Sequence, residues 1–484
     1  MACGQMPIDM PLFTFASLTL LGWLWSRATP VRRGAFVSGL CLGTGYFTLT
    51  FSWIVEPFLV SPGDTGWLAP FALLALVISL SFVWGVACYA AASVGENKNK
   101  WIKLLALWVF LSLSELVRSE WVADFPWGLF SSIWINTALG QSLFIFGPYW
   151  LSSLTILTSF LLVMPRPAIF IGLTIIGSAY MFGHIRLASN TTYGVDPIKV
   201  RIVQPNVKQS EKWKPEFARK FFDRHLELSK KSNLSDIDLI IWPETAVSYF
   251  VDMDKKITNH IAKNLSSPVV LGGRRFKNNQ LFNSAFLLSA SGEIDSIYDK
   301  THLVPFGEYI PFAKFFSKAS FFGLATDGLT GFSEGKSKMI IRTKNLESFV
   351  ILICYEVIFS EEVDTSVADA SWIIQITNDA WFGRFSGPQQ HLSLARMRAI
   401  EQGLPIIRVA NTGISAVIDP FGRVNEKIDL GQQDFIDAEV PLAIGDTYYS
   451  KIGARNWNIS LLCVLLLTIL ILAIITLSNE NRKR

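Results

Sequence analysis

The sequence has few charged residues and no paired cysteine motif, and both absences narrow the class of protein. Only 17% of the 484 residues are charged, and the net charge of +4 is spread along the chain without a basic block. Nucleic-acid-binding proteins usually carry such a block, so this class is not indicated. The five cysteines include no C-x-x-C pair, which argues against a zinc site and against a disulfide framework. No internal repeat or low-complexity tract is evident.

Apolar residues dominate the composition and indicate a membrane protein. Half of the residues are hydrophobic (50%), with 36 Phe and 16 Trp, and the mean hydropathy is +0.36. One helical crossing of a bilayer needs about 20 predominantly apolar residues. Such runs predict seven spans, at residues 8–26, 34–56, 66–93, 101–118, 144–164, 167–186 and 457–477. We therefore expect an α-helical transmembrane bundle over residues 1–190 and a C-terminal transmembrane helix over 457–477.

The charges between these runs predict the orientation, because cytoplasmic loops are enriched in Lys and Arg. Alternate loops carry basic clusters, which are Arg27, Arg32 and Arg33; Lys98, Lys100 and Lys103; Arg166; and Arg482, Lys483 and Arg484. The other loops carry the acidic residues Glu56, Asp64, Glu120 and Asp124. The N-terminus and residues 187–456 are thus predicted to lie outside the cytoplasm. Residues 1–11 do not resemble a signal peptide, so either the chain starts outside or an earlier span is missing.

An apolar segment between two of the spans is interrupted by Pro and Gly. It runs from Phe125-Pro126-Trp127-Gly128 to Gly140 and is too short and broken for a crossing. Trp rings favour the depth of the lipid headgroups, so the segment suits an interfacial or re-entrant position. An ordinary belt of aromatic side chains explains it equally well.

Residues 195–445 differ in character, because short apolar runs alternate there with charged amphipathic stretches. Strands are expected at 200–203, 239–242, 269–271, 286–288, 294–298, 339–341, 350–353, 372–376, 406–409 and 416–418, and helices at 215–232, 254–265 and 387–402. This alternation predicts a layered α/β domain. About 250 residues supply enough apolar core for one folding unit.

Three ionisable residues each follow one of these strand-like runs. Cys354 ends one run and is the one cysteine outside the long apolar segments. Glu244 follows the run at 239–242, and Lys300 follows the run at 294–298. Functional groups in α/β sheets collect at the carboxyl ends of strands. Alone, Glu244 suits a solvated loop acid and Lys300 a solvated face, but together with a thiol they predict a catalytic site.

The three residue types together suit acyl transfer. A cysteine is nucleophilic as its thiolate, and Glu244 can take the thiol proton as a general base. Lys300 can offset the thiolate and stabilise the oxyanion that forms when an acyl carbonyl is attacked. The backbone N–H of Tyr355 is a candidate second donor to that oxyanion. We therefore predict Glu244, Lys300 and Cys354 as the catalytic residues.

The segments that hold these residues resemble three signature blocks of the nitrilase (carbon–nitrogen hydrolase) superfamily. The blocks are Trp-Pro-Glu at 242–244, Asp-Lys-x-x-Leu-Val-Pro-Phe-Gly-Glu-Tyr-x-Pro at 299–311 and Ile-Cys-Tyr-Glu at 353–356. The apolar bundle before the domain and the single span after it resemble one membrane branch in particular, the apolipoprotein N-acyltransferases. The similarity covers nearly the whole chain, including Phe-Pro-Trp at 125–127.

This resemblance implies a reaction, a fold and a cellular location. Family members transfer a fatty acyl chain from a phospholipid to the free α-amino group of the diacylglyceryl-cysteine of an apolipoprotein. The transfer is ping-pong, through a thioester that would form here on Cys354. The implied fold of residues 195–445 is a nitrilase-like α-β-β-α sandwich on the periplasmic side of the bacterial cytoplasmic (inner) membrane. A monomer is expected, and no metal or organic cofactor, since His302 and His391 are isolated in the sequence.

The resemblance also assigns supporting or substrate-binding residues. Glu308, in the Phe-Gly-Glu-Tyr block, matches a second essential acid of the family. Tyr355 and Glu356 match the residues that follow the nucleophile. Trp213 resembles a tryptophan of the family's mobile loop, and Trp127 resembles one in its membrane part. Family members often have eight spans and a cytoplasmic N-terminus, and the opening Met-Ala-Cys-Gly resembles the middle of the family's first span.

Three other functions fit parts of the sequence. The run 331–335 fits the G-x-S-x-G elbow of serine hydrolases, but the elbow needs a strand before it and a helix after it. Here a Gly-rich loop precedes the motif and a strand is expected to follow. A membrane-tethered amidase or nitrilase would use the same three residues with water as the acceptor. A transporter is disfavoured because the spans hold few ionisable residues, Glu115 and Arg118, with Glu115 expected at an interface.

The loop at 311–332 is rich in apolar side chains. We expect it either to form a lipid-facing lid or to pack on its own domain, through Phe312, Phe315, Phe316, Phe321, Phe322 and Leu324. A site that holds little water would protect a thioester from hydrolysis while it waits for its amine.

Overall fold

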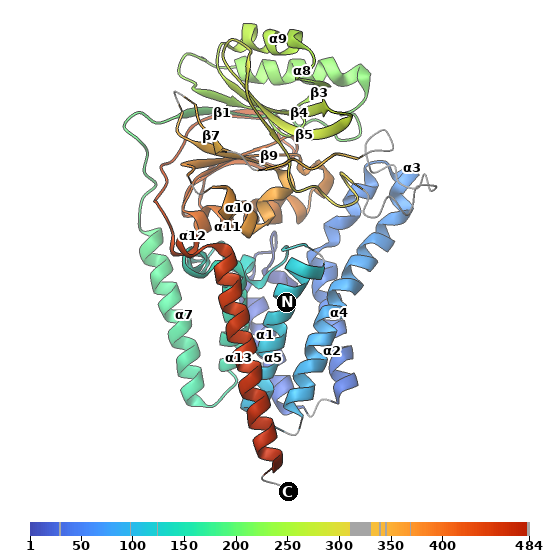
Figure 1. Ribbon diagram of the computed structural model, residues 1–484, viewed down its shortest axis with the longest axis vertical. Coiled ribbons are helices and arrows are strands. Elements are labelled where there is room, and N and C mark those ends of the chain that lie inside the picture. Colours follow the sequence, from blue (N-terminus) through green and yellow to red (C-terminus); the bar gives the residue numbers. More distant parts are fainter. Residues whose placement is uncertain are drawn as a thin grey trace. The chain divides into compact units, whose positions relative to one another are not determined.

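The chain folds into two compact units, seen in the ribbon of a computed structural model (Figure 1). The helical unit comprises Met1–Ser52, Pro70–Ser189 and Asp446–Arg484. The α/β unit comprises Trp53–Ala69 and Asn190–Gly445. The structure describes residues 1–28, 31–96, 98–122, 124–309, 331–337, 340–343, 346–367 and 369–481.

Seven long helices occupy the seven ranges in which spans were expected. They are α1 (Pro11–Arg27), α2 (Arg32–Thr50), α4 (Ala69–Gly95), α5 (Lys100–Val117), α6 (Leu143–Leu161), α7 (Arg166–Leu187) and α13 (Ala454–Asn481). Shorter helical turns connect them, namely η1 (Ala2–Gly4), η2 (Ser52–Leu59), α3 (Pro62–Thr65), η3 (Gly66–Leu68), η4 (Arg118–Val122), η5 (Phe130–Trp134), η6 (Ala138–Ser142) and α12 (Tyr448–Ile452).

Several of these helices are long and apolar enough to cross a bilayer. By length and composition, four described segments qualify: Pro62–Gly95, Ala138–Leu161, Arg166–Leu187 and Ala454–Thr476. The bent pair α2 and η2 makes a fifth if it counts as one span. Helix α1 is shorter, with 17 residues, and α5 carries Lys100, Lys103 and Glu115. The chain is thus a membrane protein, and seven crossings stay a prediction.

The segment between α5 and α6 is irregular and lies inside the helical unit. Residues 125–135 are all buried, and the backbone turns sharply at Gly128, whose φ is +68°. Arg118 donates from Nη1 to the Trp127 carbonyl (3.0 Å) and from Nη2 to the Gly128 carbonyl (3.1 Å). Non-helical backbone within a membrane unit needs hydrogen-bond partners from outside its own segment. Here the Arg118 side chain supplies partners for these two carbonyls. This burial favours the re-entrant interpretation over a belt of rings at the lipid headgroups.

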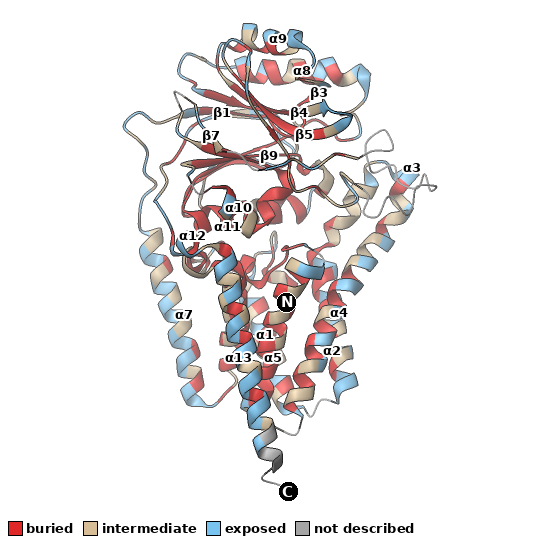
Figure 2. Ribbon diagram, in the orientation of Figure 1, coloured by how far each residue is buried: buried red, intermediate tan, exposed pale blue. Residues whose placement is uncertain are grey.

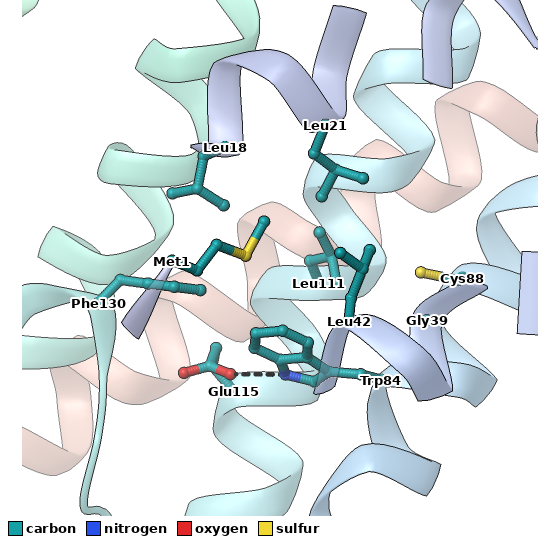
Figure 3. A pocket seen from close by; sticks show the side chains of 10 residues that line it. All are labelled: Met1, Leu18, Leu21, Gly39, Leu42, Trp84, Cys88, Leu111, Glu115 and Phe130. Atoms are coloured by element: carbon teal, nitrogen blue, oxygen red, sulfur yellow. Dashed lines mark hydrogen bonds between the residues drawn. The ribbon is translucent and has the colours of Figure 1, made fainter. Parts of the chain in front are cut away.

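Glu115 lies in the interior of the helical unit, with 2% of its surface exposed. Its carboxylate accepts from Arg118 Nε (2.9 Å) and Nη2 (2.7 Å), and from Trp84 Nε1 (3.0 Å). These partners replace the water that an interfacial acid would bind, so burial is tolerated. Figure 3 shows Glu115 at the edge of a pocket whose other lining residues are Met1, Leu18, Leu21, Gly39, Leu42, Trp84, Cys88, Leu111 and Phe130.

The α/β unit contains two sheets. The first has seven strands in the order β13-β1-β2-β4-β5-β6, with β3 beside β4. Its strands are β1 (Lys199–Gln204), β2 (Leu239–Ile241), β3 (Val247–Phe250), β4 (Val269–Lys277), β5 (Gln280–Leu288), β6 (Ile294–Asp299) and β13 (Asp434–Glu439). The parallel neighbours β1, β2 and β4 lie at its centre. Their carboxyl ends therefore meet at one edge of the sheet.

The second sheet has six strands in the order β12-β11-β10-β9-β8-β7. These are β7 (Ile340–Ile341), β8 (Phe349–Ile353), β9 (Trp372–Thr377), β10 (Ile406–Ala410), β11 (Ser415–Ile418) and β12 (Val424–Ile428). Strands β8, β9 and β10 are parallel and buried at every residue. Burial on both faces explains their almost continuous Ile, Val and Leu content.

Helices cover the outer faces of the two sheets. Helices α8 (Pro215–Lys230) and α9 (Lys255–Leu265) lie over the first sheet, and α10 (Ser360–Ser366) and α11 (Gly387–Gln402) lie over the second (Figure 1). Figure 2 shows that both sheets are buried along most of their length. The short turns η8 (Cys354–Ile358) and η9 (Asp379–Phe382) follow β8 and β9. The predicted α-β-β-α sandwich is confirmed.

Candidate active site

Glu244 lies where the chain leaves β2, on a tight turn against β4. Pro243 has no N–H to donate, so the sheet ladder ends there. Thr245 adopts a left-handed backbone conformation, with φ at +46°. A Cβ on Gly272 of β4 would lie 2.5 Å from the Thr245 nitrogen and 2.6 Å from the Glu244 Cα. Glycine at position 272 therefore permits the turn, and Glu244 is buried with 7% of its surface exposed.

Lys300 follows β6 directly and is held by the backbone on both sides. Its N–H donates to the Asn283 carbonyl (2.9 Å), and its carbonyl accepts from the Gly335 N–H (2.8 Å). A Cβ on Gly335 would overlap the Asp299 carbonyl oxygen, so only glycine permits this approach. Lys300 is 1% exposed.

The G-x-S-x-G run at 331–335 thus packs against the Lys300 and Glu308 segments. A Cβ on Gly331 would overlap the Glu308 carbonyl oxygen. Within the described residues 331–337 and 340–343, no helix follows the run, whereas strand β7 does. The part of a serine-hydrolase elbow that should follow the serine is therefore missing, as expected. The proposed lid residues Phe312, Phe315, Phe316, Phe321, Phe322 and Leu324 lie outside the described residues.

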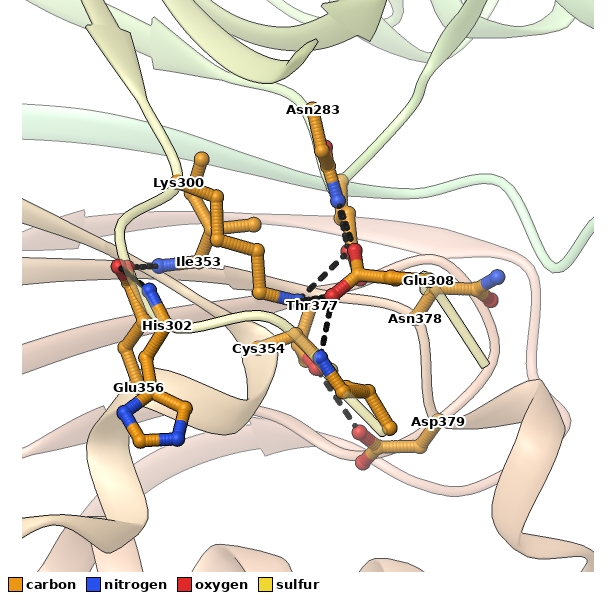
Figure 4. A network of polar contacts seen from close by, with 12 residues as sticks. Asn283, Lys300, His302, Glu308, Ile353, Cys354, Glu356, Thr377, Asn378 and Asp379 are labelled. Carbon is orange, nitrogen blue, oxygen red and sulfur yellow. Dashed lines mark hydrogen bonds and ion pairs between the residues drawn. The ribbon is translucent and has the colours of Figure 1, made fainter. Parts of the chain in front are cut away.

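A lysine, two carboxylates and an amide form a tight buried cluster, and Figure 4 labels Lys300, Glu308 and Asn283 of this cluster. Lys300 Nζ lies 2.8 Å from Glu308 Oε2 and 3.8 Å from Glu244 Oε1. Asn283 Nδ2 donates to Glu244 Oε1 (2.7 Å) and to Glu308 Oε1 (2.8 Å). The backbone N–H of Val304 donates to Glu308 Oε2 (2.8 Å). These donors hold two carboxylates together that would otherwise repel each other.

The electrostatics of the cluster favour a charged lysine and a basic glutamate. Burial alone lowers the pKa of a lysine, but the carboxylates of Glu308 and Glu244 outweigh it and raise the pKa of Lys300. Burial raises the pKa of Glu244, Glu308 adds to this effect, and Lys300 opposes it. A carboxylate with a raised pKa accepts protons more readily than an exposed one.

Cys354 directly follows β8 and has an unusual backbone conformation beside these charges. Its φ is +52°, in the left-handed region, and it is 5% exposed. Its carbonyl accepts from Gln375 Nε2 (3.3 Å) and lies 3.2 Å from His391 Nε2. Burial raises the pKa of the thiol, Glu244 raises it further and Lys300 lowers it. The resting residue is thus a thiol, which needs a base before it can attack a substrate.

Glu356 joins the turn after Cys354 to the segment after Lys300. Its Oε2 accepts from the Ile353 N–H (2.7 Å). Its Oε1 accepts from the Tyr298 hydroxyl (2.6 Å) and from the Thr301 N–H and hydroxyl (2.8 Å each). Tyr355 packs its ring on His302, with ring centroids 5.6 Å apart. Glu356 therefore positions the backbone that carries two of the predicted catalytic residues.

A second buried network lies against the carbonyl of Cys354, and sequence reasoning missed it. Arg408 pairs with Asp379, and its Nη1 donates to Gln375 Oε1 (2.7 Å). His391 Nδ1 lies 2.9 Å from Asp379 Oδ1. Burial opposes ionisation of Asp379, but Arg408 and His391 outweigh it and lower the pKa of the carboxyl. His391 is thus not isolated in space, although the nearest of these partners in sequence is 12 residues away.

Aromatic packing extends this network to the segment between α2 and α4. The Phe382 ring meets the His391 ring edge-on, with centroids 5.4 Å apart. The Trp53 ring meets Phe382 at 4.8 Å, also edge-on. Trp53 begins the Trp53–Ala69 segment of the α/β unit, so residues before α4 contribute to the surroundings of the site.

The predicted tryptophans occupy different places. Trp213 is half-buried beside Lys212, and the Arg274 guanidinium lies 4.6 Å from its ring centroid. Lys212 Nζ donates to the backbone carbonyl of Glu244 (3.1 Å), which brings the Trp213 loop to the cluster. Trp127 belongs to the helical unit, where its carbonyl accepts from Arg118. Lys212 and Asn283 were not predicted, because single polar residues in a loop and a strand carry no recognisable sequence signal.

Nothing in the described residues suggests a metal centre. No group of three or more His, Cys, Asp or Glu side chains in those ranges is arranged to hold a metal ion.

Two sequence families match the chain over most of its length. Residues 1–161 match the apolipoprotein N-acyltransferase N-terminal domain, and residues 199–448 match the carbon-nitrogen hydrolases. An apolipoprotein N-acyltransferase of Rhodopseudomonas palustris is 32% identical, covering 94% of this chain and 90% of that relative. An apolipoprotein N-acyltransferase of Rickettsia bellii is 35% identical, covering 95% of this chain and 93% of that relative. The chain belongs to the apolipoprotein N-acyltransferase family.

Membership of the apolipoprotein N-acyltransferase family confirms the resemblance inferred from the three motif blocks. The carbon-nitrogen hydrolase match spans every strand of the α/β unit, so the predicted fold class is also confirmed. An amidase of the nitrilase superfamily from Nesterenkonia AN1 aligns with a TM-score of 0.42 and 16% identity, covering 55% of this chain and 99% of that chain.

Proposed function

We propose that this chain transfers a fatty acyl chain from a phospholipid to the N-terminal α-amino group of the diacylglyceryl-cysteine of apolipoproteins. This is the activity for which its relatives are named. The observation that carries the proposal is the buried cluster in which Lys300 and Glu244 lie 3.8 Å apart and both act on the Cys354 thiol. A thiol, a base and a fixed cation are the groups that thioester formation needs.

The first half-reaction forms a thioester. Glu244 takes the proton of the Cys354 thiol, and the sulfur attacks the carbonyl carbon of a phospholipid ester. The carbonyl oxygen becomes an oxyanion that Lys300 and the Tyr355 N–H stabilise. The ester C–O bond then breaks, and the lysophospholipid leaves with the proton returned by Glu244. The acyl chain stays on Cys354.

The second half-reaction releases the acyl chain to an amine. The α-amino group of the acceptor attacks the thioester carbonyl and gives a proton to Glu244. The C–S bond breaks, an amide forms, and Glu244 returns the proton to the Cys354 sulfur. The amidase alternative, in which water takes the place of the amine, is not favoured, because the curated relatives are named as acyltransferases.

The remaining predicted residues take supporting roles in this proposal. Glu308 fixes the Lys300 ammonium, to which it pairs at 2.8 Å, and Glu356 fixes the backbone beside Cys354. Trp213 and Trp127 are proposed to contact the lipid substrates, as the family resemblance implies.

The membrane explains how lipid substrates reach a buried thiol. Moving an acyl chain into water costs about 0.8 kcal/mol per CH₂ group, so an enzyme held on the bilayer avoids a large penalty. We assign residues 1–190 and 457–477 to the membrane and 195–445 to a catalytic domain on the periplasmic side of the inner membrane. The alternation of basic and acidic loops supports this orientation. We expect a monomer.

A mass measurement tests the reaction. Purified protein incubated with phospholipid is expected to gain one hydroxylamine-sensitive acyl group, which Cys354→Ser abolishes and the exposed control Cys463→Ser retains. Adding a diacylglyceryl peptide should yield acylated peptide rather than free fatty acid. Absence of the adduct on the wild-type protein contradicts the proposal, and release of fatty acid alone supports a hydrolase.

A labelling experiment tests the orientation. A single cysteine introduced at Lys98 should resist an impermeant thiol reagent applied from outside intact cells. One introduced at the exposed Asp64 should react. The reverse result overturns the assignment of the catalytic domain to the periplasmic side.

A further inference from the structure

Lys212 is a buried cation of the site that the mechanism above does not use. It is 4% exposed, and within the described part of the chain its ammonium donates one hydrogen bond, to the Glu244 carbonyl at 3.1 Å. An ammonium has three N–H donors, so two are available for another acceptor. Resting on the function proposed above, we propose that Lys212 binds the substrate carbonyl oxygen as it becomes an oxyanion, and is a fourth catalytic residue.

The charges of the site support a second cation. Lys300 already faces two carboxylates, Glu308 at 2.8 Å and Glu244 at 3.8 Å. Among the four side chains Glu244, Glu308, Lys300 and Lys212, two positive and two negative charges balance. Without Lys212 the other three carry a net negative charge. An uncompensated buried charge is strongly unfavourable. Lys212 therefore offsets the charge that two neighbouring carboxylates leave in the site.

The balance of positive and negative charges in the site persists during the reaction. When Glu244 takes the thiol proton, its negative charge passes to the sulfur and then to the carbonyl oxygen of the tetrahedral intermediate. The number of charges does not change, but the negative charge moves away from Glu244. Lys300 keeps Glu308 as its close partner at 2.8 Å. Lys212 has no carboxylate partner within hydrogen-bonding distance among the described residues, so its donors remain available to the new oxyanion.

The loop that carries Lys212 is anchored to strand ends next to the nucleophile. The Lys212 carbonyl accepts from the Ser248 hydroxyl (3.1 Å). Gln209 Oε1 accepts from Asn378 Nδ2 (2.7 Å), and Asn378 Oδ1 accepts from Asn411 Nδ2 (2.8 Å). Asn378 directly follows β9, and β9 pairs with β8, the strand that Cys354 directly follows. These hydrogen bonds fix the position of the loop relative to the thiol. Stabilisation of an oxyanion by a preorganised donor requires such a fixed position.

The electrostatic environment is consistent with this role. Burial lowers the pKa of Lys212 to about 8, while Glu244 and Cys354 oppose that effect. A lysine of this kind is still mainly protonated at neutral pH and gains from any negative charge placed beside it. An oxyanion is such a charge, and it forms on the oxygen of the carbonyl carbon that the Cys354 sulfur attacks.

Single-turnover acylation tests the proposal. With micelles of a dioleoyl phosphatidylethanolamine and no amine acceptor, Lys212→Met is expected to lower the rate constant of thioester formation about 100-fold, the usual effect of removing one oxyanion donor. The lipid concentration that gives half-maximal rate should change less than threefold. Lys212→Arg, which keeps the charge, should retain at least one tenth of the rate. Lys208→Met, an exposed lysine of the same loop, is the matched control and should match the wild type.

The outcomes separate this inference from the proposed function. If the wild type forms no thioester, the proposed function fails. If the wild type is acylated and Lys212→Met acylates at the same rate, only the role of Lys212 is overturned. Lys212→Gln provides a second uncharged variant with polar atoms, in case the methionine destabilises the fold. A folded Lys212→Gln protein at the wild-type rate overturns the proposal equally.

Discussion

The backbone carbonyl oxygen of Cys354 lies 3.2 Å from His391 Nε2. A carbonyl oxygen only accepts hydrogen bonds, so the imidazole supplies the proton of this contact. Gln375 Nε2 donates to the same oxygen at 3.3 Å. Together they hold the peptide of a residue whose φ is +52°, a conformation that costs a non-glycine residue about 1–2 kcal/mol. The geometry of the nucleophile therefore depends on residues of β9 and α11.

Replacing His391 should slow acylation without weakening lipid binding. His391→Leu removes the donor to the Cys354 carbonyl and a partner of Asp379 Oδ1, so the cysteine peptide is free to relax. We expect a 10- to 100-fold lower rate constant of thioester formation, within the range of losses for misplaced catalytic groups, with an unchanged half-saturating lipid concentration. His391→Gln keeps a donor and should recover part of the rate. Equal rates for His391→Leu and the wild type contradict this role.

The amide of Asn283 should be essential for its donor group rather than for its shape. Asn283→Asp places a third carboxylate between Glu244 and Glu308, where the amide now donates at 2.7 and 2.8 Å. Like charges at this distance raise one pKa strongly, so Glu244 or its neighbour binds a proton at neutral pH. Thioester formation should fall at least about 100-fold, comparable to removing a general base.

Two comparisons make the Asn283 test specific. Asn278→Asp, at the exposed turn between β4 and β5, should acylate as the wild type does. Raising the pH should partly restore the rate of thioester formation by Asn283→Asp, because a higher pH ionises the carboxylates that share a proton. If the rate of Asn283→Asp is low and independent of pH, proton sharing is not the cause of the loss.

Glu356 is expected to act mainly on stability. Glu356→Gln turns one acceptor oxygen into a donor group, which then faces either the Ile353 N–H or the donors of Tyr298 and Thr301. A buried donor left without an acceptor costs about 1–3 kcal/mol, and more where the acceptor was charged. The midpoint of thermal unfolding should therefore fall by several degrees. Glu293→Gln, an exposed acid of the same unit, serves as the control and should leave the midpoint unchanged.

The three residues that we propose as catalytic could be singled out from the sequence because their signals are local. Glu244, Lys300 and Cys354 each follow an apolar run directly, and each lies in a recognisable motif. Asn283 and His391 have no such signal. Asn283 meets Glu244 from 39 residues away, and His391 meets Cys354 from 37 residues away. These contacts depend on which strands and helices become neighbours, and that pairing is a property of the fold.

The same distinction applies to the secondary structure. The central strands β8, β9 and β10 were predicted because every residue is buried and the runs are apolar. Strands β3, β12 and β13 were not, since their residues are mostly half-buried or exposed and include several acids and polar side chains. β13 pairs with β1 more than 200 residues earlier, which no local pattern indicates. The contact between Glu115 and Trp84 has no local signal either, since Trp84 lies on another helix.

Glycine at position 272 should be required for the Glu244 turn. A Cβ there would lie 2.5 Å from the Thr245 nitrogen, a backbone atom that cannot rotate away. Gly272→Ala should therefore move the turn, destabilise the fold by about 1–3 kcal/mol, the usual cost of overpacking, and lower the acylation rate. Gly194→Ala, where a Cβ meets no atom closer than 3.7 Å, should change neither thermal unfolding nor acylation. A stable and active Gly272→Ala protein is incompatible with this account.

The pH dependence of acylation should report the protonation of Lys212. Its pKa is lowered from 10.5 to about 8 by burial, against the opposing effects of Glu244 and Cys354. His225 also faces it and is neutral in this range, with a pKa near 3, and Arg274 lies over the adjacent Trp213 ring. In the assay without an amine acceptor, kcat/KM for thioester formation should be level up to about pH 8 and fall above it. Lys212→Arg should remain level there, because arginine keeps its proton.

Thermal unfolding gives an independent check of the same shift, with its sign fixed by linkage. Between about pH 8 and 10.5 the unfolded chain holds the Lys212 proton more tightly than the folded protein does. The folded state is therefore favoured as the pH rises through this window. Relative to Lys212→Met, which cannot titrate at this position, the wild-type unfolding midpoint should increase between pH 8 and 10.5. A constant difference between the two midpoints means that burial does not lower this pKa, and the acylation decline above pH 8 must then come from another group.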